Sequence, residues 1–290
     1  MKIHNIFLLF ISCAFGSHPH STFGAQLTRG DDLMCAIFSN QLEKVCELLD
    51  SGVDVNSPDC TLSQESPLAR AALDKKTAIV KELLKRGADI NITKENGDTP
   101  LHAACHSKHM GILQLLLENG ALVNVRGLLG RTPLYLATAN ENTKAVRLLL
   151  DHNANPDTKA DYDDTPLVPA AANGNIRILE MLLEAHNYNT DLNRAFRMAA
   201  AYDQVNSMKK LLEYDADPNL ATSGKKTALY YAKRNGKENS ISFLESLRFQ
   251  RNLLFFVAKQ LQAGSKPQAQ PNFGHLPLEV IQKIAIMIRR

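Results

Sequence analysis

Residues 96–104 read Asn-Gly-Asp-Thr-Pro-Leu-His-Ala-Ala, and the Thr-Pro-Leu at their centre recurs along the chain at a fixed interval. Related triplets begin at Ser66, Thr99, Thr132 and Thr165, each 33 residues after the one before. About 15 residues after each triplet comes a run of two or three leucines, and three of these runs are followed by a turn that begins with Gly or Asn. A fixed period of this length indicates a repeat array, in which each unit stacks on its neighbours.

Each unit is predicted to contain two helices. Thr99 can cap the first helix with its hydroxyl, and Pro100 suits the first helical position, where a missing N–H costs nothing. The second helix carries an apolar stripe at Ile112, Leu115 and Leu116, and Gly120 provides a left-handed end. We therefore expect an all-α solenoid of helix–turn–helix units, each followed by an extended loop.

The units resemble ankyrin repeats, whose pattern is Thr-Pro-Leu-His-x-Ala-Ala, then Leu-Leu, then Gly-Ala-Asp-x-Asn. The resemblance covers residues 31–247 as about seven units and implies hairpin-like loops between them. The sixth unit starts at Arg194, only 29 residues after Thr165, so we expect a shortened loop near residues 186–193 and a local change in stacking.

The two ends of the chain differ in character from the array. Residues 1–25 combine Lys2 with an apolar run, which is typical of a secretory signal peptide and leader, and a retained anchor or a plain apolar extension is the alternative. Export to the periplasm or the medium, with a host-directed role as a further option, follows from the first interpretation. Cys35, Cys46, Cys60 and Cys105 would remain after cleavage; because three of them fall where repeats need small apolar residues, we expect structural thiols rather than disulfides.

The C-terminal region divides into a predicted capping helix at 248–264, a linker at 265–275 and a short helix at 276–290. From Arg248 onward there are seven basic residues and one acid, so the tail is basic and the body before it mildly acidic. Such a tail favours acidic partners or membrane surfaces, or it simply solvates an apolar helix. The last stretch resembles the opening of an F-box at Leu276, Pro277, Glu279 and Ile284; the alternative is an amphipathic helix that packs on the array or pairs with another chain.

Two clusters were considered as sites of chemistry. His102, Cys105, His106 and His109 fall on one helical face with spacing that zinc could use, but the resemblance assigns the two outer histidines structural roles and the thiol a buried position. Asp161, Asp163 and Asp164 form an acidic cluster that fits a solvated turn better than an acid–base pair. Because no phosphate loop, nucleophile elbow or metalloprotease motif occurs, we expect no enzyme, no cofactor and no metal site.

The ankyrin resemblance implies that partners bind a concave face built from loop tips and first helices. Carried onto this chain, the predicted contact positions are Glu95, Asn96, His106, Ser107, Leu128, Leu129, Arg131, Asn140, Asp161, Tyr162, Asn173 and Tyr202. Two leucines at a loop tip, with a tyrosine one repeat away, predict a hot spot in repeats three to five. The alternative is that both leucines fold back onto the neighbouring loop.

These observations predict a non-catalytic scaffold that binds a protein partner. We expect a monomer that does not bind nucleic acid and that holds no membrane span once the signal peptide is removed. The alternative function is an adaptor that holds a target on the array and recruits ubiquitin-ligase machinery through the F-box-like tail.

Overall fold

The computed structural model describes residues 29–58, 65–185 and 192–262, with side chains described up to Arg251. Fourteen α-helices occur in this part of the chain and follow one another as seven consecutive pairs, which we number as repeats one to seven. The pairs are α2 (Arg29–Phe38) with α3 (Leu42–Asp50), α4 (Pro67–Leu73) with α5 (Thr77–Lys85), α6 (Pro100–Ser107) with α7 (Met110–Glu118), α8 (Pro133–Ala139) with α9 (Thr143–Asp151), α10 (Leu167–Asn173) with α11 (Ile176–Ala185), α12 (Leu192–Ala201) with α13 (Val205–Glu213), and α14 (Ala228–Arg234) with α15 (Glu238–Gln262).

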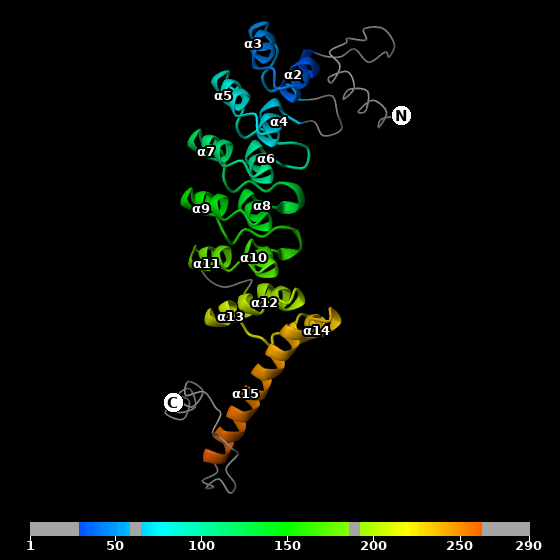
Figure 1. Cartoon of the computed structure of the whole chain (residues 1–290), viewed down its shortest axis with the longest axis vertical. Coiled ribbons are helices and arrows are strands. Elements are labelled where there is room, and N and C mark those ends of the chain that lie inside the picture. The colour runs from blue at the N-terminus through cyan, green and yellow to red at the C-terminus, as the bar shows by residue number, and fades with distance from the viewer. Residues whose placement is uncertain (1–28, 59–64, 186–191, 263–290) are drawn as a thin grey trace, which may run out of the picture.

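The helices stand in two columns (Figure 1). First helices form one column and second helices the other, and the loops between repeats project beyond the first-helix column. This arrangement confirms the expected all-α solenoid, although α12 begins at Leu192, two residues earlier than the sequence suggested.

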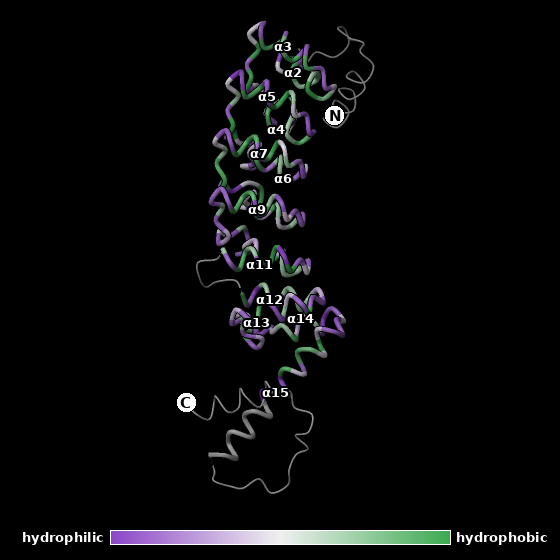
Figure 2. Tube along the Cα trace, turned by 60° about the vertical axis from the view of Figure 1, so that its left-hand side comes forward, coloured by the Kyte–Doolittle hydropathy of each residue, from purple (hydrophilic) through white to green (hydrophobic). Residues whose placement is uncertain are grey.

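The core runs along the stack between the columns. First helices contribute small side chains such as Ala71, Ala104 and Ala137, and second helices contribute Leu83, Leu116 and Leu149 at the same register. Alanine lets neighbouring helices approach closely, while leucine fills the volume between a helix and its successor. Figure 2 shows the hydrophobic residues within the helices and hydrophilic residues along the turns at one edge of the stack. No single pair can bury its apolar side alone, so the repeats depend on one another.

The inter-repeat loops are hairpin-like but contain no assigned strand in the described residues. The same backbone hydrogen bond, from the N–H of one residue to the carbonyl four residues later, closes four of them. These bonds join Lys94 to Asp98 (2.9 Å), Gly127 to Arg131 (2.8 Å), Ala160 to Asp164 (2.8 Å) and Thr222 to Lys226 (3.1 Å).

A ladder of asparagine side chains joins consecutive repeats on the other side of each loop. Each Oδ1 accepts a hydrogen bond from a backbone N–H of the next repeat, and we call each such bond a rung. The rungs run from Asp89 to Asn56, from Leu122 to Asn91 and from Asn155 to Asn124 (each 2.8 Å). Within repeat six, Asn193 near the start of α12 accepts the Asp217 N–H in a similar way (2.6 Å). The last asparagine of the Gly-Ala-Asp-x-Asn motif therefore links consecutive repeats, because its side chain accepts a backbone N–H of the following repeat.

Second helices stop where a residue adopts a left-handed backbone. Gly87 (φ 81°), Gly120 (φ 87°) and Asn153 (φ 63°) occupy this position in successive repeats, and glycine and asparagine adopt it most readily. In repeat seven the equivalent residue is Arg248, and the helix continues through it. The helix expected to begin at 248 is thus the continuation of α15, which begins at Glu238, and its C-terminal half extends away from the stack (Figure 1).

Within the described residues, no helix is both long enough and apolar enough to cross a membrane. The predicted signal peptide, the whole linker at 265–275 and the F-box-like stretch with Leu276, Pro277, Glu279 and Ile284 lie outside those residues, and these assignments stay predictions.

Candidate functional site

Two neighbouring loop tips carry large hydrophobic side chains into solvent. Leu128 is 50% exposed and Leu129 43% exposed in the loop before α8, and Tyr162 is 81% exposed in the loop before α10. We call these three residues the loop-tip surface. None of the three is buried against the neighbouring loop, so the alternative that the leucines fold back is not what the structure shows.

Both tips hold their hydrophobic residue in a left-handed backbone conformation. Leu129 has φ 57° and ψ 30°, and Tyr162 has φ 64° and ψ 20°, within the short 3₁₀ turns η1 (Leu128–Gly130) and η2 (Asp161–Asp163). Gly130 (φ 66°) and Asp163 (φ 61°) follow in the same region, so each tip has two successive left-handed residues. For a bulky side chain this region costs about 1–2 kcal/mol. Strain of this kind gathers at sites where function requires it.

Hydrogen bonds from the preceding repeat fix the first tip. The backbone N–H of Leu128 donates to Asp98 Oδ1 (2.9 Å), and His102 Nε2 lies 3.1 Å from the Arg131 carbonyl. These contacts come from residues about 30 positions earlier, so the loop is held from outside as well as by its own closing bond.

A second set of contacts links the two tips to each other. Arg126 Nε donates to the Gly130 carbonyl (3.3 Å), and its Nη2 lies 3.7 Å from Asp161 Oδ1. Both charged side chains are about half exposed, so the ion pair itself contributes little free energy. Its geometric effect is that Arg126 spans the gap between the Leu128 loop and the Tyr162 loop.

Behind the tips, polar groups line the first helices. The guanidinium of Arg131 lies 5.2 Å from the ring centre of Tyr135, and Arg194 pairs with Asp164. Burial raises the pKa of the Tyr135 phenol, and the nearby Asp164 carboxylate adds to the effect. This ring takes the place of the histidine found at position 102 in repeat three. Arg131, Tyr135, Asp164 and Arg194 therefore form paired contacts behind the loop-tip surface.

A family model described as ankyrin repeats, in three copies, matches residues 33–127 and 124–195. Together the two matches cover more than half of the chain. The chain belongs to the ankyrin-repeat family. The matched region holds most of the first five helix pairs, and the last two pairs extend the same stacking beyond it. Among curated proteins, no sequence matches this chain.

Ankyrin repeats indicate a protein–protein interaction domain, and the array places most of the predicted contact residues at the surface. Glu95, Asn96, Asp161, His106, Asn173 and Tyr202 are exposed, and Arg131 and Asn140 are half-buried. Except for Ser107, every residue of the predicted set keeps at least partial access to solvent.

Ser107 is a correction to the predicted set. Its side chain is buried, and its hydroxyl donates to the Ala104 carbonyl (3.1 Å). A serine near the end of a helix often bonds back to an earlier carbonyl, which turns the hydroxyl away from solvent.

The asparagines of the set have a structural role that the family pattern did not reveal. The side-chain amide of Asn140 donates to the Cys105 carbonyl (3.4 Å), and that of Asn173 donates to the Ala139 carbonyl (3.3 Å). Asn235 does the same to Ala201 (3.0 Å). Each amide thereby caps the end of a first helix in the preceding repeat, and this bond restricts what it can offer a partner.

The three histidines and the cysteine of the possible zinc cluster have different roles in the structure. His102 Nδ1 accepts the backbone N–H of Thr99 (3.1 Å), and His109 Nδ1 accepts that of Ile112 (3.2 Å) at the start of α7. Cys105 is fully buried, which raises the pKa of its thiol to about 12, while His106 is exposed. No group of three His, Cys, Asp or Glu side chains in the described ranges is placed to hold a metal ion. Within the described residues, Cys35, Cys46 and Cys105 form no disulfide.

Arg126 and Asp98 are the site residues that the sequence analysis missed. Asp98 directly precedes the cap of α6, and Arg126 lies two residues before Leu128. The sequence does place opposite charges about one repeat apart, at Arg126 and Asp161, which could have indicated a contact between the two loops. Which side of its loop each residue faces is seen only in the structure.

Proposed function

We propose that this ankyrin array is a non-catalytic scaffold that binds a folded protein partner through the loop-tip surface. The observation that carries the proposal is the pair of neighbouring tips that hold Leu129 and Tyr162 exposed in a left-handed backbone. Among the described non-glycine residues with a left-handed backbone, Leu129 and Tyr162 are the two with hydrophobic side chains, and the others are polar or charged.

The surrounding contacts favour a preformed site. Asp98 and His102 fix the first tip from the preceding repeat, and Arg126 links it to the second. A surface that is already ordered loses little conformational entropy when a partner docks. Exposed Tyr162 beside two leucines also matches the composition of interface hot spots, where one or two residues often dominate the binding free energy.

Affinity capture with the mature chain, followed by identification of the captured protein, supplies the partner for a quantitative test. The dissociation constant is then measured for the wild type, for the double variant Leu128→Ser/Leu129→Ser and for Tyr162→Ser. Loss of hot-spot contacts worth about 2 kcal/mol or more predicts binding at least about 30-fold weaker.

Leu122→Ser is the matched control, because Leu122 is 57% exposed but lies in the turn after α7, away from the tips. This variant should bind like the wild type. If the double variant bound normally while its melting temperature fell, the leucines would be packing residues and the proposed site would be wrong.

Export of the chain is a second part of the proposal. Its support is the sequence of residues 1–25, where one lysine precedes a short apolar run and small residues follow. N-terminal sequencing of the protein recovered outside the cytoplasm should begin after the apolar run. An intact Met1 on cytoplasmic protein would contradict export.

A further inference from the structure

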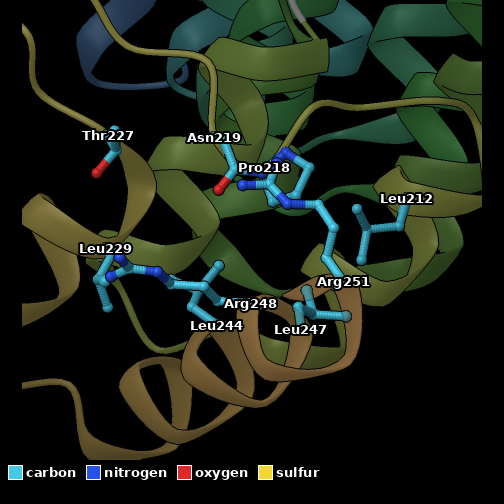
Figure 3. Close-up of a pocket in the computed structure, with 9 residues that line it drawn as sticks. All are labelled: Leu212, Pro218, Asn219, Thr227, Leu229, Leu244, Leu247, Arg248 and Arg251. Carbon is cyan, nitrogen blue, oxygen red and sulfur yellow. The ribbon is translucent and has the colours of Figure 1, made fainter. Parts of the chain in front are cut away.

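The ankyrin array leaves a pocket open at its C-terminal end. The pocket has a volume of about 440 Å³ and lies between α15, the N-terminal end of α14 and the loop after α13 (Figure 3). Its lining residues are Leu212, Pro218, Asn219, Thr227, Leu229, Leu244, Leu247, Arg248 and Arg251. Apart from the two arginines the lining is uncharged, and four of the nine residues are leucines.

The pocket exists because repeat seven lacks the turn found in the other units. After the second helix of an inner repeat, a left-handed residue turns the chain back, and a buried alanine follows it: Ala88, Ala121, Ala154 and Ala216. In repeat seven, α15 continues through Arg248, so no alanine of that kind follows at the same place. Leu244 and Leu247, on the last turns of α15 before this point, therefore face the pocket.

Asn219 is the rung residue that has lost its partner. It ends the loop Asp215-Ala216-Asp217-Pro218-Asn219, at the position that Asn91 and Asn124 occupy in earlier repeats. Those two side chains accept an N–H from the next loop at 2.8 Å. Asn219 lines the pocket, and its side chain makes no hydrogen bond within the described residues. The ladder therefore ends at Asn219, whose exposed side-chain oxygen can still accept a hydrogen bond from a segment bound in the pocket.

A segment further along the chain repeats the missing sequence. Ala269-Gln270-Pro271-Asn272 matches Ala216-Asp217-Pro218-Asn219 at three of four positions, and Ala154-Asn155-Pro156-Asp157 has the same alanine and proline. The described loops with a buried alanine share one pattern. The alanine is followed by a residue whose N–H donates to an asparagine side chain, and then by an apolar residue.

The intervening chain is long enough for this segment to return. Helix rise of about 1.5 Å per residue places Gln262 about 21 Å from Arg248. The seven residue steps from Gln262 to Ala269 can span about 24 Å when extended. The segment can thus reach the pocket along the outside of α15.

We propose that residues 269–272 seat in this pocket of the same chain as a final rung of the ladder. Ala269 fills the place of the buried loop alanine, the Gln270 N–H donates to Asn219 Oδ1, and Pro271 lies beside Pro218. The predicted linker thereby becomes the terminal cap of the solenoid, which an open repeat end requires for solubility. This inference is independent of the proposed loop-tip function.

Amide hydrogen exchange of the full chain tests the proposal. The Gln270 amide should exchange about tenfold or more slowly than an unstructured amide, and Asn219→Ala should remove most of that protection. Ala269→Glu should remove it too, because a long acidic side chain does not fit where the equivalent alanines are buried. Asn206→Ala, at an exposed asparagine, and Gln268→Glu, one position away, are the matched controls and should leave it unchanged.

Three results would overturn the proposal. Free exchange at Gln270 in the wild type would leave the pocket to another occupant, and protection that survives Asn219→Ala would place the segment elsewhere. Protection that disappears on dilution, together with a concentration-dependent mass in light scattering, would put the segment on a second copy of the chain.

Discussion

Leu129 and Tyr162 occupy a backbone region that disfavours large side chains, and both point into solvent. In the equivalent turn before α6, Asn96 takes the position of Leu129 and Tyr162 and does not adopt a left-handed backbone, whereas Gly97 (φ 84°) takes the position of Gly130. Strain without burial brings no folding benefit, so we assign the benefit to binding.

Replacement of Tyr162 by asparagine should therefore stabilise the isolated chain and weaken partner binding together. Asparagine tolerates the left-handed region, so we expect a gain of about 0.5–1 kcal/mol in the free energy of unfolding. Chemical denaturation measures it. Tyr214→Asn is the control, because Tyr214 has φ −105° and no strain to relieve. A loss of stability in Tyr162→Asn would show that the tyrosine packs on the fold.

His102 makes the fold sensitive to acid. Burial lowers the pKa of its imidazole, and Nδ1 accepts the Thr99 N–H, so a proton on that nitrogen would face a donor. Because the folded pKa lies below the unfolded value, this contribution to stability is complete above about pH 6.5 and is lost as the pH falls.

The melting temperature should accordingly drop below about pH 6.5 more steeply in the wild type than in His102→Gln. Glutamine can accept the same N–H in a capping box but does not titrate. His106→Gln, at an exposed histidine, should keep the wild-type slope. Equal slopes in all three proteins would remove His102 as the titrating group.

Residue-level predictions from the sequence succeeded where the family pattern fixes exposure and failed where a hydrogen bond decides it. The exposed Leu128, Leu129 and Tyr162 follow from their place in the loop. Ser107 and Asn140 sit at positions that are exposed in the pattern, yet one hydroxyl and one amide turn toward carbonyls. A single sequence does not show which carbonyl is left uncapped one repeat away.

At the scale of elements, starts and stops of helices were the most predictable feature. Ser66 and Thr132 accept the N–H three residues on, as expected of caps before Pro67 and Pro133. Stops were predictable where Gly or Asn occurs and not where it is missing. Arg248 at a stop position leaves α15 free to continue, which the assumption of a new helix at 248 overlooked.

The asparagine ladder adds hydrogen bonds to the apolar packing between consecutive repeats. Asn124 accepts the Asn155 N–H (2.8 Å) and donates to the Asn153 carbonyl (3.2 Å). Two hydrogen bonds between repeats three and four are worth about 1–3 kcal/mol. Asn124→Ala should lower the free energy of unfolding by that amount in chemical denaturation, whereas Asn206→Ala should change it little. An unchanged midpoint for Asn124→Ala would mean that water replaces the rung at no loss.

At the scale of the whole molecule, the period of 33 residues was enough to predict the architecture, because equal spacing of caps and leucines forces equal stacking. The spacing breaks near residues 186–191 and the motif ends before the tail, and because residues 186–191 and 263–290 lie outside the described residues, the predictions made for them stay untested. The protein is a one-dimensional array, and we propose that its partner surface lies on the loop side of repeats three to five.

The most direct test of that account is a hydrogen-exchange footprint of the captured partner on the full chain. We predict that binding slows exchange in residues 126–131 and 159–164, with little change in the second helices α7, α9 and α11. Slower exchange in those second helices, with the two loop tips unchanged, would contradict the central claim.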